Sequence, residues 1–335
     1  MVVQDDALLK YLDDDGTTIE PEFYVPIVPL ALVNAPSGIG TGWSTSVPPY
    51  NPLDIIDNIE RLMDGREMKE MVPWVRGFKG TITKVDEHTF MTEGVIEKVD
   101  AHTLRITELP LHTWTNAYKE FLETKWLGSE LEAGKARVRA LRAKHTEQSV
   151  EFELDVRGGS MAVLDRRDLL KEFKLRSSIK TSNMVLFHPD GIREYSSPLD
   201  IIRDFYPVRR EFYDKRKAHL EQLLSREIRV LQNRFRFCDL VSNAKLLVIN
   251  RPKADVLADL AACGIEPLAS GADDVASFEY LLNSPISSLT RERLERLGND
   301  KNAKEKELKE LQQTSAVSMW REDLKALRKA LGKLF

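Results

Sequence analysis

Three glycines stand at alternate positions, Gly38, Gly40 and Gly42, within the stretch NAPSGIGTGW that covers residues 34–43. A glycine-rich loop can hold phosphate, but G-x-G-x-G matches neither the dinucleotide fingerprint nor the P-loop, which disfavours a nucleotide-binding enzyme. Because glycine lacks a Cβ, such a loop can lie close to another surface and can adopt positive φ angles on both sides of Ile39. Two interpretations remain open: the isoleucine side chain points outward, or it packs inside a tight turn.

A second stretch with suitable chemistry is RRDLLKEFKLRSSIKTSN, residues 166–183. It mixes lysines and arginines with hydroxyl groups and an amide, the side chains that commonly contact phosphate oxygens. A solvated junction between a helix and a strand would have the same composition, so both interpretations remain open. The basic and aromatic stretch at 205–217 is interpreted as the solvated flank of a long helix.

Other reactive groupings find weaker support. Residues 13–16, DDDG, are interpreted as a solvated turn rather than as an acidic metal cluster. The histidines are scattered without metal-ligand spacing, and no serine stands in a nucleophile elbow. The two cysteines, Cys238 and Cys263, form no CxxC pair and indicate a reducing compartment. The sequence therefore predicts no catalytic residue and no metal site in this chain.

The composition of the 335 residues limits the class of function. Acidic and basic residues nearly balance, with a net charge of −4, which excludes a globally basic nucleic-acid binder but permits a local basic surface. No apolar run approaches the ~18 residues of a membrane span, and the N-terminus lacks the order of a signal peptide. We expect a soluble intracellular protein, or a piece of one, with two or more domains.

The elements that must position these groups follow from the residue pattern. Residues 1–65 are rich in proline and end on a helix at 52–63, where isoleucines recur at helical spacing. Residues 75–200 are predicted to form a mixed α/β region. Its stretch 80–110 alternates apolar and polar side chains in short runs, which predicts an antiparallel meander. This region also contains a predicted helix at 115–127, a strand at 150–156 and one arm of a hairpin at 183–187.

The C-terminal part has a different residue composition. Residues 199–249 contain no glycine and one proline, Pro207, and a helix of about 45 residues would be ~70 Å long. Residues 250–288 break into short pieces, and Thr290 starts a second long helix. The pattern predicts an antiparallel coiled coil with a small domain at its tip, and a single-chain helical bundle is the alternative. The polar stretch 298–307 favours the exposed, slender pair.

Several motifs, in this order over nearly the whole chain, together resemble the eukaryotic-type DNA topoisomerase II family, type IIA. They are EPEFYVPIVPLALVN with GIGTGWSTSVPPYNP, RLMDG, FKGTI, ITELPLHTWT with YKE, FKLRSSIKTSNMVLF, ISSLTRERLERL and MWREDLKAL. The form GIGTGW resembles the eukaryotic or large-DNA-virus branch rather than gyrase.

The resemblance implies an α+β multi-domain fold, in which a mixed α/β tower domain precedes a long antiparallel coiled coil with a small helical C-gate domain at its tip. The implied domains are the end of the winged-helix domain with the DNA-bending loop (1–65), the tower (66–198), the ascending coiled-coil helix (199–245), the C-gate dimerisation domain (246–289) and the descending coiled-coil helix (290–335).

The resemblance also implies roles for particular residues. Ile39 matches the family's DNA-bending isoleucine, which inserts between base pairs of the cut duplex, and Trp114 matches a tower tryptophan at the DNA surface. The family's DNA-contacting segment matches Lys174, Leu175, Arg176, Ser177, Ser178, Ile179, Lys180, Thr181, Ser182 and Asn183.

The chain departs from the family pattern near both sites. Ala35, Pro36 and Ser37 stand where the family usually has glycine, alanine and an acid, so we expect a stiffer loop and one negative charge fewer near DNA. Arg176 and Lys180 replace residues that are commonly neutral, which should strengthen the attraction to phosphate.

By resemblance, the chain is the DNA-gate and C-gate portion of an ATP-dependent type II DNA topoisomerase. Its expected partners are double-stranded DNA and a second copy of itself, and not a membrane. The expected compartment is the nucleus, with a mitochondrial or viral replication compartment as alternatives. The family cleaves DNA with a tyrosine that follows an arginine, and none of the eight tyrosines here does.

The acidic Mg²⁺ site and the ATPase are expected in the full-length enzyme, so this chain requires no cofactor of its own and should not cut DNA alone. The rival interpretation is a coiled-coil dimeric scaffold without DNA chemistry.

Overall fold

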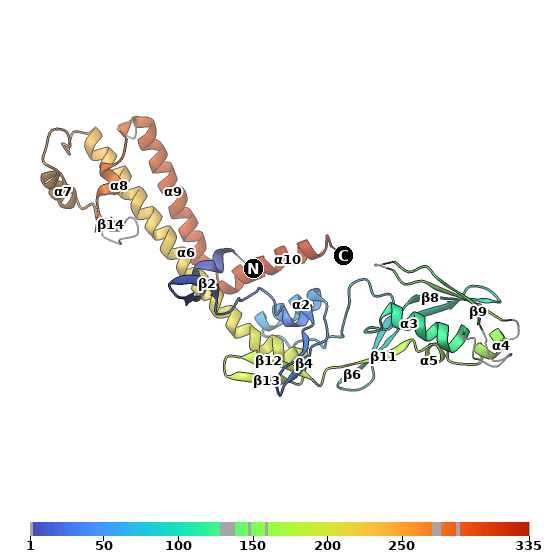
Figure 1. Ribbon diagram of the computed structural model, residues 1–335. Coiled ribbons are helices and arrows are strands. Elements are labelled where there is room, and N and C mark those ends of the chain that lie inside the picture. Colours follow the sequence, from blue (N-terminus) through green and yellow to red (C-terminus); the bar gives the residue numbers. More distant parts are fainter. Residues whose placement is uncertain are drawn as a thin grey trace. The chain divides into compact units, whose positions relative to one another are not determined.

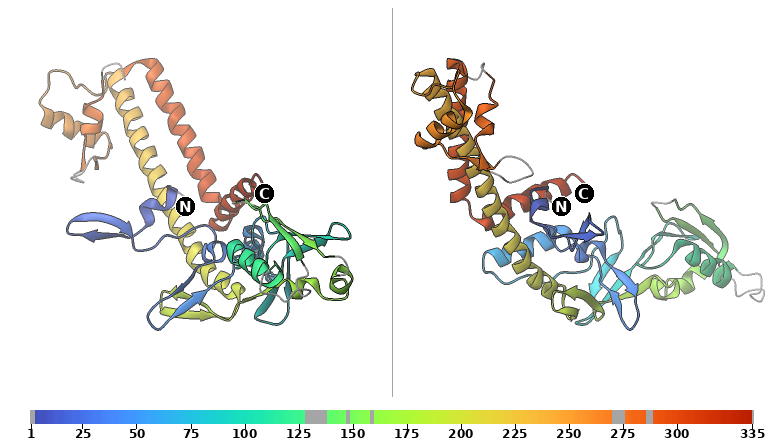
Figure 2. Two further views of the ribbon diagram at one scale, coloured as in Figure 1. Left: turned by 45° about the vertical axis from the view of Figure 1, so that its right-hand side comes forward. Right: turned by 60° about the vertical axis from the view of Figure 1, so that its left-hand side comes forward.

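The chain divides into two compact units, one of residues 28–207 and the other of residues 1–27 together with 208–335. We call them the sheet unit and the helical unit (Figures 1 and 2). The computed structural model describes residues 3–127, 138–146, 149–157, 160–269, 276–285 and 289–334. Small antiparallel sheets alternate with helices in these ranges, which confirms the mixed α and β composition that the sequence predicts.

The sheet unit begins with a short helix, a hairpin and a longer helix. These are α1 (Ala31–Asn34), β3 (Ser37–Ile39), β4 (Ser44–Ser46) and α2 (Pro52–Met63). Helix α2 has the bounds that the sequence predicts. In the structure the side-chain oxygen of Asn51 caps it, and the isoleucines of one face are buried.

Two antiparallel sheets form the middle of this unit, with the strand orders β11-β6-β5 and β7-β8-β10-β9. Their strands are β5 (Thr81–Lys84), β6 (Thr89–Glu93), β7 (Val95–Lys98), β8 (Thr103–Glu108), β9 (Val138–Ala143), β10 (Phe152–Val156) and β11 (Arg176–Lys180). The single meander expected from the sequence is therefore divided between two sheets. The division falls at Gly94, where an added Cβ would lie 2.4 Å from the carbonyl oxygen of Glu108.

Helices complete the core of the sheet unit: α3 (Thr115–Leu122) with a π-helical turn η2 (Glu123–Leu127), α4 (Ser160–Leu164) and α5 (Leu169–Glu172). The predicted helix at 115–127 is thus α3 followed by η2. The Tyr118 hydroxyl of α3 donates to the backbone oxygen of Phe173 at 2.7 Å, and the Trp126 ring stacks on Phe173 at 4.5 Å. These contacts join α3 to the chain that leads into β11.

The last strands of the sheet unit form a hairpin, β12 (Met184–His188) and β13 (Gly191–Tyr195), paired from Met184 with Tyr195 to His188 with Gly191. The sequence predicts this hairpin from the turn residues that follow 183–187.

The helical unit is built mainly around long helices. Its elements are η1 (Val3–Leu8), β1 (Tyr11–Asp14), β2 (Thr17–Pro21), α7 (Lys253–Ala262), β14 (Leu268–Ala269), β15 (Ala276–Ser277), α8 (Glu279–Leu282), α9 (Arg291–Gln313) and α10 (Ala316–Leu331). Helix α6 (Pro198–Ser242) begins in the sheet unit and continues into the helical unit.

Helices α6 and α9 lie side by side and run antiparallel (Figures 1 and 2). Lys217 donates to the backbone oxygen of Gln312 at 3.1 Å, whereas the later residue Gln232 bonds the earlier residue Glu305 at 3.1 Å. The sequence predicts one descending helix over 290–335, but the structure has two helices, α9 and α10, with a short non-helical link between them. Ser315 is extended and caps α10 by accepting from the backbone of the first turn at 3.0 Å.

A buried ionic cluster, which we call the clasp, ties η1 to α6 and α10. Arg209 donates to Asp5 at 2.8 Å, and Arg216 donates to both oxygens of Asp5 at 2.6 and 2.7 Å. Arg216 also donates to Asp323 at 2.7 Å. Arg209, Arg216 and Asp5 are each at most 2% exposed, so these charges depend on one another rather than on water.

Candidate nucleic-acid interface

The side chain of Ile39 is 94% exposed at the end of strand β3. Strands β3 and β4 pair antiparallel, with Ile39 opposite Ser44, and the backbone N–H of Gly40 donates to the oxygen of Trp43 at 2.7 Å. The interpretation in which this isoleucine packs inside a turn is therefore wrong. An apolar side chain held in water by an ordered hairpin gains nothing from burial until a partner covers it.

The glycines around Ile39 are only partly explained by the hairpin itself. Gly42 has a φ of 81°, which favours glycine, but Gly38 and Gly40 lie outside the left-handed region, so positive φ on both sides of Ile39 is not found. An added Cβ at Gly38 would meet no atom within 4 Å, and at Gly40 it would lie 3.7 Å from the Trp43 oxygen. Space for close approach, not strain in the turn, is what these two glycines provide.

The backbone before the hairpin is strained at Ala35. This residue ends α1 with a φ of 49° and a ψ of 61°, a left-handed conformation that costs a residue with a Cβ roughly 1–2 kcal/mol. The following Pro36 accepts a hydrogen bond from the backbone of Val47 at 3.0 Å. The stiffer loop expected from the sequence is consistent with this proline, and the departure from glycine occurs where glycine would fit best.

The hairpin is braced by residues far away in the sequence. The Asn183 side-chain amide donates to the Ser44 hydroxyl at 3.0 Å, and the Asn183 backbone oxygen accepts from the Ser46 N–H at 2.7 Å. The backbone N–H of Val185 donates to the Thr45 hydroxyl at 3.2 Å. We call these three hydrogen bonds the brace. They fix β4 against the start of β12, so the direction of Ile39 is set by the sheet unit.

Trp114 lies just before the first turn of α3 and is 83% exposed. Its backbone is extended, with a φ of −75° and a ψ of 131°, so its ring stands outside the helix. The buried Tyr118, one turn later, anchors α3 to the core. An exposed tryptophan on an anchored helix can contact a partner without a change in the fold, and its contact with DNA stays a prediction.

The segment 174–183 alternates between the core and the surface. The side chains of Leu175, Ile179 and Thr181 are at most 5% exposed, so they cannot reach a ligand. Exposed side chains of the segment belong to Lys174, Arg176, Ser178, Lys180 and Ser182, and those of Ser177 and Asn183 are half-buried. Strand β11 pairs with β6 and therefore presents only alternate residues outward.

The comparisons with known proteins show the family of this fold. The family model that describes the A subunit of DNA gyrase and topoisomerase IV matches residues 1–325. The chain belongs to this family. DNA topoisomerase 2 of Pisum sativum is 36% identical over 360 residues, which cover 97% of this chain and 25% of that protein. DNA topoisomerase 2 of Saccharomyces cerevisiae is 35% identical over 366 residues, with 96% and 25% covered.

A solved structure agrees with these relatives. The crystal structure of the Plasmodium falciparum topoisomerase II DNA-binding, cleavage and re-ligation domain matches with a TM-score of 0.85 and 34% identity, covering 98% of this chain and 47% of that one. The chain spans about a quarter of the length of the curated relatives. The resemblance to eukaryotic-type topoisomerase II that the motifs indicate is thereby confirmed.

The two basic replacements in this topoisomerase segment differ in their surroundings. Arg176 donates to Glu93 at 2.6 Å and also pairs with Asp168. The hydrogen bond from Arg176 lowers the pKa of Asp168, and the carboxylates of Glu93 and Asp168 raise the pKa of Arg176. Lys180 is exposed and pairs with no acid among the described residues. Of the two, only Lys180 adds a charge that is not already compensated.

Lys174 has a further constraint. Its φ is 50°, and its ammonium group lies 4.6 Å from the centre of the Phe121 ring on α3. A cation–π contact of this kind orients the side chain while leaving the charge accessible. It also links the basic segment to the helix that carries Trp114.

Sequence reasoning missed the brace, because Ser44 and Asn183 are 139 residues apart and no local pattern joins them. It also did not predict that Glu93 and Asp168 neutralise the charge of Arg176. Within the described ranges, no three histidine, cysteine or acidic side chains are grouped as they would be around a metal ion. No described helix is both long enough and apolar enough to cross a bilayer.

Proposed function

We propose that this chain is the DNA-gate and C-gate portion of an ATP-dependent type II DNA topoisomerase. In this proposal the sheet unit binds and bends a duplex, and the helical unit holds two copies together to control exit of the transported duplex. The proposal rests on membership of the family and on one observation, the 94% exposed Ile39 at the end of a braced hairpin.

The energetics explain why a braced hairpin is needed. Separating two stacked base pairs costs a few kcal/mol, and bending a site of 20–30 bp costs ~1–6 kcal/mol more. A mobile isoleucine would add an ordering cost to both terms. Because the brace orders β4 before DNA arrives, that cost has already been met in folding.

Binding of the bent duplex arms would come from the surface around Trp114, Lys174 and Lys180. Insertion of Ile39 stabilises the complex only if the bend brings phosphates within reach of these basic groups. Each neutralised phosphate lowers the slope of log affinity against log salt by about 0.9. Binding should therefore be independent of sequence and should weaken steeply as salt rises.

A fluorescence-transfer bend assay on a labelled duplex tests this function. The chain should shorten the end-to-end distance of the duplex, and Ile39→Ala should bind with little bending. Val85→Ala is a matched control, because Val85 is an apolar side chain that is 60% exposed elsewhere in the sheet unit. Equal bending by wild type and Ile39→Ala would remove Ile39 from the proposed role.

The homodimer is proposed through residues 246–290, where the helical unit exposes apolar side chains. Leu247 is 63% exposed and Ile249 is 92% exposed, and both line an apolar pocket of about 340 Å³. Its walls include Val241, Leu246, Leu281, Leu282 and Leu289. We propose that α6 and α9 form the coiled coil that carries this dimer surface.

Sedimentation at micromolar concentration tests the dimer. Wild type should sediment as a dimer, and Leu247→Asp with Ile249→Asp should sediment as a monomer with unchanged helix content. Val85→Asp, which also replaces an exposed apolar side chain by a carboxylate but in the sheet unit, should leave the dimer intact. A wild-type monomer would overturn this part of the proposal.

Strand cleavage is proposed for the full-length enzyme only. It requires the tyrosine that the family places after an arginine, together with Mg²⁺ and the ATPase. We expect this chain alone to leave a supercoiled plasmid uncut, which gel electrophoresis would show. The proposed compartment is the nucleus, with a mitochondrial or viral replication compartment as alternatives.

A further inference from the structure

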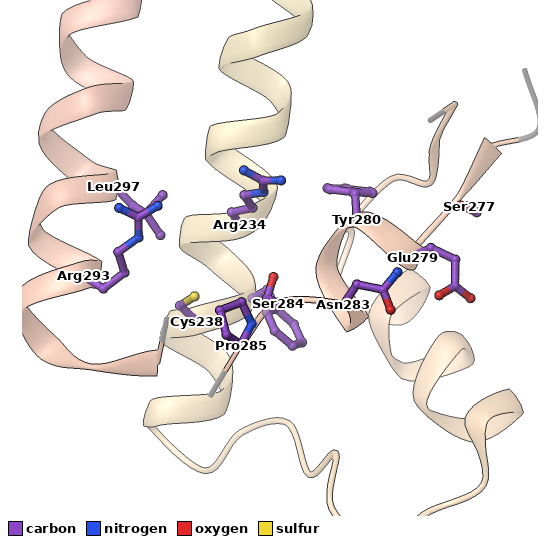
Figure 3. Close-up of a pocket in the computed structure, with 11 residues that line it drawn as sticks. Arg234, Cys238, Ser277, Glu279, Tyr280, Asn283, Ser284, Pro285, Arg293 and Leu297 are labelled. Carbon is purple, nitrogen blue, oxygen red and sulfur yellow. The ribbon is translucent and has the colours of Figure 1, made fainter. Parts of the chain in front are cut away.

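A polar pocket of about 730 Å³ lies in the helical unit between α6, α8 and α9 (Figure 3). It is separate from the surfaces used above for DNA. Its walls are Arg234, Phe237 and Cys238 of α6, Arg293 and Leu297 of α9, and Ser277, Glu279, Tyr280, Asn283, Ser284 and Pro285. Three elements that are distant in sequence therefore meet around one cavity.

The pocket carries an excess of positive charge. Arg234 and Arg293 come from the two facing helices, and neither guanidinium pairs with a carboxylate among the residues that the structure describes. The Nε of Arg234 is buried without a hydrogen-bond partner. Glu279 is the one acid of the described wall, and its carboxylate is already paired with Lys253.

Both arginines act on the same part of the cavity. The Cys238 thiol, which lines the same pocket, is buried, and burial raises its pKa, while the charges of Arg293 and Arg234 oppose that rise. The positive charges of both guanidinium groups therefore act on the same group of the pocket wall, the Cys238 thiol. The buried Nε of Arg234 lacks an acceptor, which is unfavourable until a hydrogen-bond acceptor enters.

The remaining polar groups give the pocket a fixed wall and adaptable donors. Tyr280 is held in place, because its hydroxyl accepts from Asn233 at 2.7 Å and donates to the backbone oxygen of Glu266 at 3.1 Å. The amide of Asn283 and the hydroxyl groups of Ser277 and Ser284 also line the cavity. They can bond the oxygens of a ligand that the arginines attract.

We propose that this pocket binds a small organic phosphate. Guanidinium groups suit phosphate because each can donate two parallel hydrogen bonds to it. The volume of about 730 Å³ has room for more than one inorganic phosphate, and the polar groups of Ser277, Asn283 and Ser284 suit further polar atoms on the ligand. By joining α8 to α6 and α9, it stabilises the domain at the tip of the helix pair. This inference is independent of the proposed DNA function.

Isothermal titration of the whole chain tests the proposal with two probes, adenosine triphosphate without Mg²⁺ and inositol hexakisphosphate. At least one probe should bind and raise the unfolding temperature, and the stronger of the two identifies the source of the phosphate. Arg234→Gln and Arg293→Gln should each weaken binding at least about tenfold, the cost of a lost charge-assisted hydrogen bond.

Matched controls come from the same helices. Arg229→Gln on α6 and Arg296→Gln on α9 remove exposed arginines that lie outside the pocket and should leave binding unchanged. If Arg234→Gln fails to fold, Arg293→Gln decides alone, because Arg293 is exposed. No binding of either probe at millimolar concentration, or equal losses in the control variants, would overturn the proposal. So would a loss of dimer in Arg293→Gln without probe binding to wild type, since an acidic group of a second copy would then be the occupant.

Discussion

The β3–β4 hairpin of the sheet unit and the clasp of the helical unit place their central side chains at opposite extremes of exposure. Ile39 is 94% exposed, and no described side chain covers it, whereas Asp5 is 2% exposed and accepts three hydrogen bonds from two arginines. The isoleucine contributes little to the free fold and gains from an external partner. The aspartate does the reverse, because its charge is tolerable only inside the fold.

The difference shows where a substitution should be detected. Changes in the clasp should alter the free energy of unfolding, and changes in the hairpin should alter what the protein does to DNA. An opposite outcome at either place would break the comparison.

The largest effect is expected for Asp5→Asn. The change keeps the shape of the side chain but leaves Arg209 and Arg216 with too little negative charge, which should cost about 3–5 kcal/mol of unfolding free energy. Urea unfolding followed through helical circular dichroism measures it. Asp14→Asn is the control, since Asp14 is exposed in β1, and its midpoint should match wild type. An unchanged midpoint for Asp5→Asn would mean that the clasp is dispensable.

Thr45→Val should test the brace. The change removes the acceptor of the Val185 N–H and leaves a partly buried donor unpaired, at a cost of about 1–3 kcal/mol. If the brace directs Ile39, duplex bending should fall while affinity changes less. Thr45→Ser keeps the hydroxyl group and should restore bending. Normal bending by Thr45→Val would show that the hairpin is directed by other contacts.

Ala35→Gly should stabilise the sheet unit slightly. Glycine relieves roughly 1–2 kcal/mol of left-handed strain, while greater freedom of the unfolded chain takes back about 0.4–1 kcal/mol. Thermal unfolding should therefore show a net gain of between about 0 and about 1.6 kcal/mol. Ala35→Val, with a branched side chain at the same φ, should instead lose stability. A loss of stability in both variants would show that loop contacts of Ala35, rather than its left-handed φ, determine its effect on stability.

The smallest effect separates the two basic replacements in β11. Lys180→Ala should reduce the steepness of the salt dependence of DNA binding by about 0.9, the value for one phosphate contact. Arg176→Ala should reduce it by less, because Glu93 and Asp168 already compensate that charge. Fluorescence anisotropy over a salt series measures both slopes. Equal slopes for the two variants would show that the ion pairs of Arg176 open on DNA.

The sequence predicted those parts of the fold that depend on local patterns. Helix α2 has its predicted bounds, and α6 covers 45 residues near the predicted range, because caps and apolar spacing act within one element. The family was also accessible from ordered motifs. The spacing of Ile39 with glycines did not by itself predict its outward direction, since that spacing suits a packed turn as well as an exposed one. The resemblance to the family was needed to favour the exposed side chain.

What the sequence did not predict depends on contacts between distant residues. The division of the meander at Gly94, the brace at Asn183 and the clasp at Asp5 each join segments whose pairing leaves no local pattern. The burial of Leu175, Ile179 and Thr181 likewise follows from how β11 faces the core. The sequence did not predict the interruption between α9 and α10, because Ser315, which caps α10, is one polar residue in a polar stretch.

The central claim is that Ile39 enters the duplex, and the most direct measurement is the fluorescence of a base analogue that brightens when it loses its stacking neighbour. Placed at the centre of the bound duplex, the analogue should brighten when wild type binds and stay dim when Ile39→Ala binds at the same occupancy. Unfolding should be the same for both proteins, because a packed isoleucine would cost ~2–5 kcal/mol and this one is exposed. Equal brightening with the variant, or bound wild type without brightening, would contradict the account.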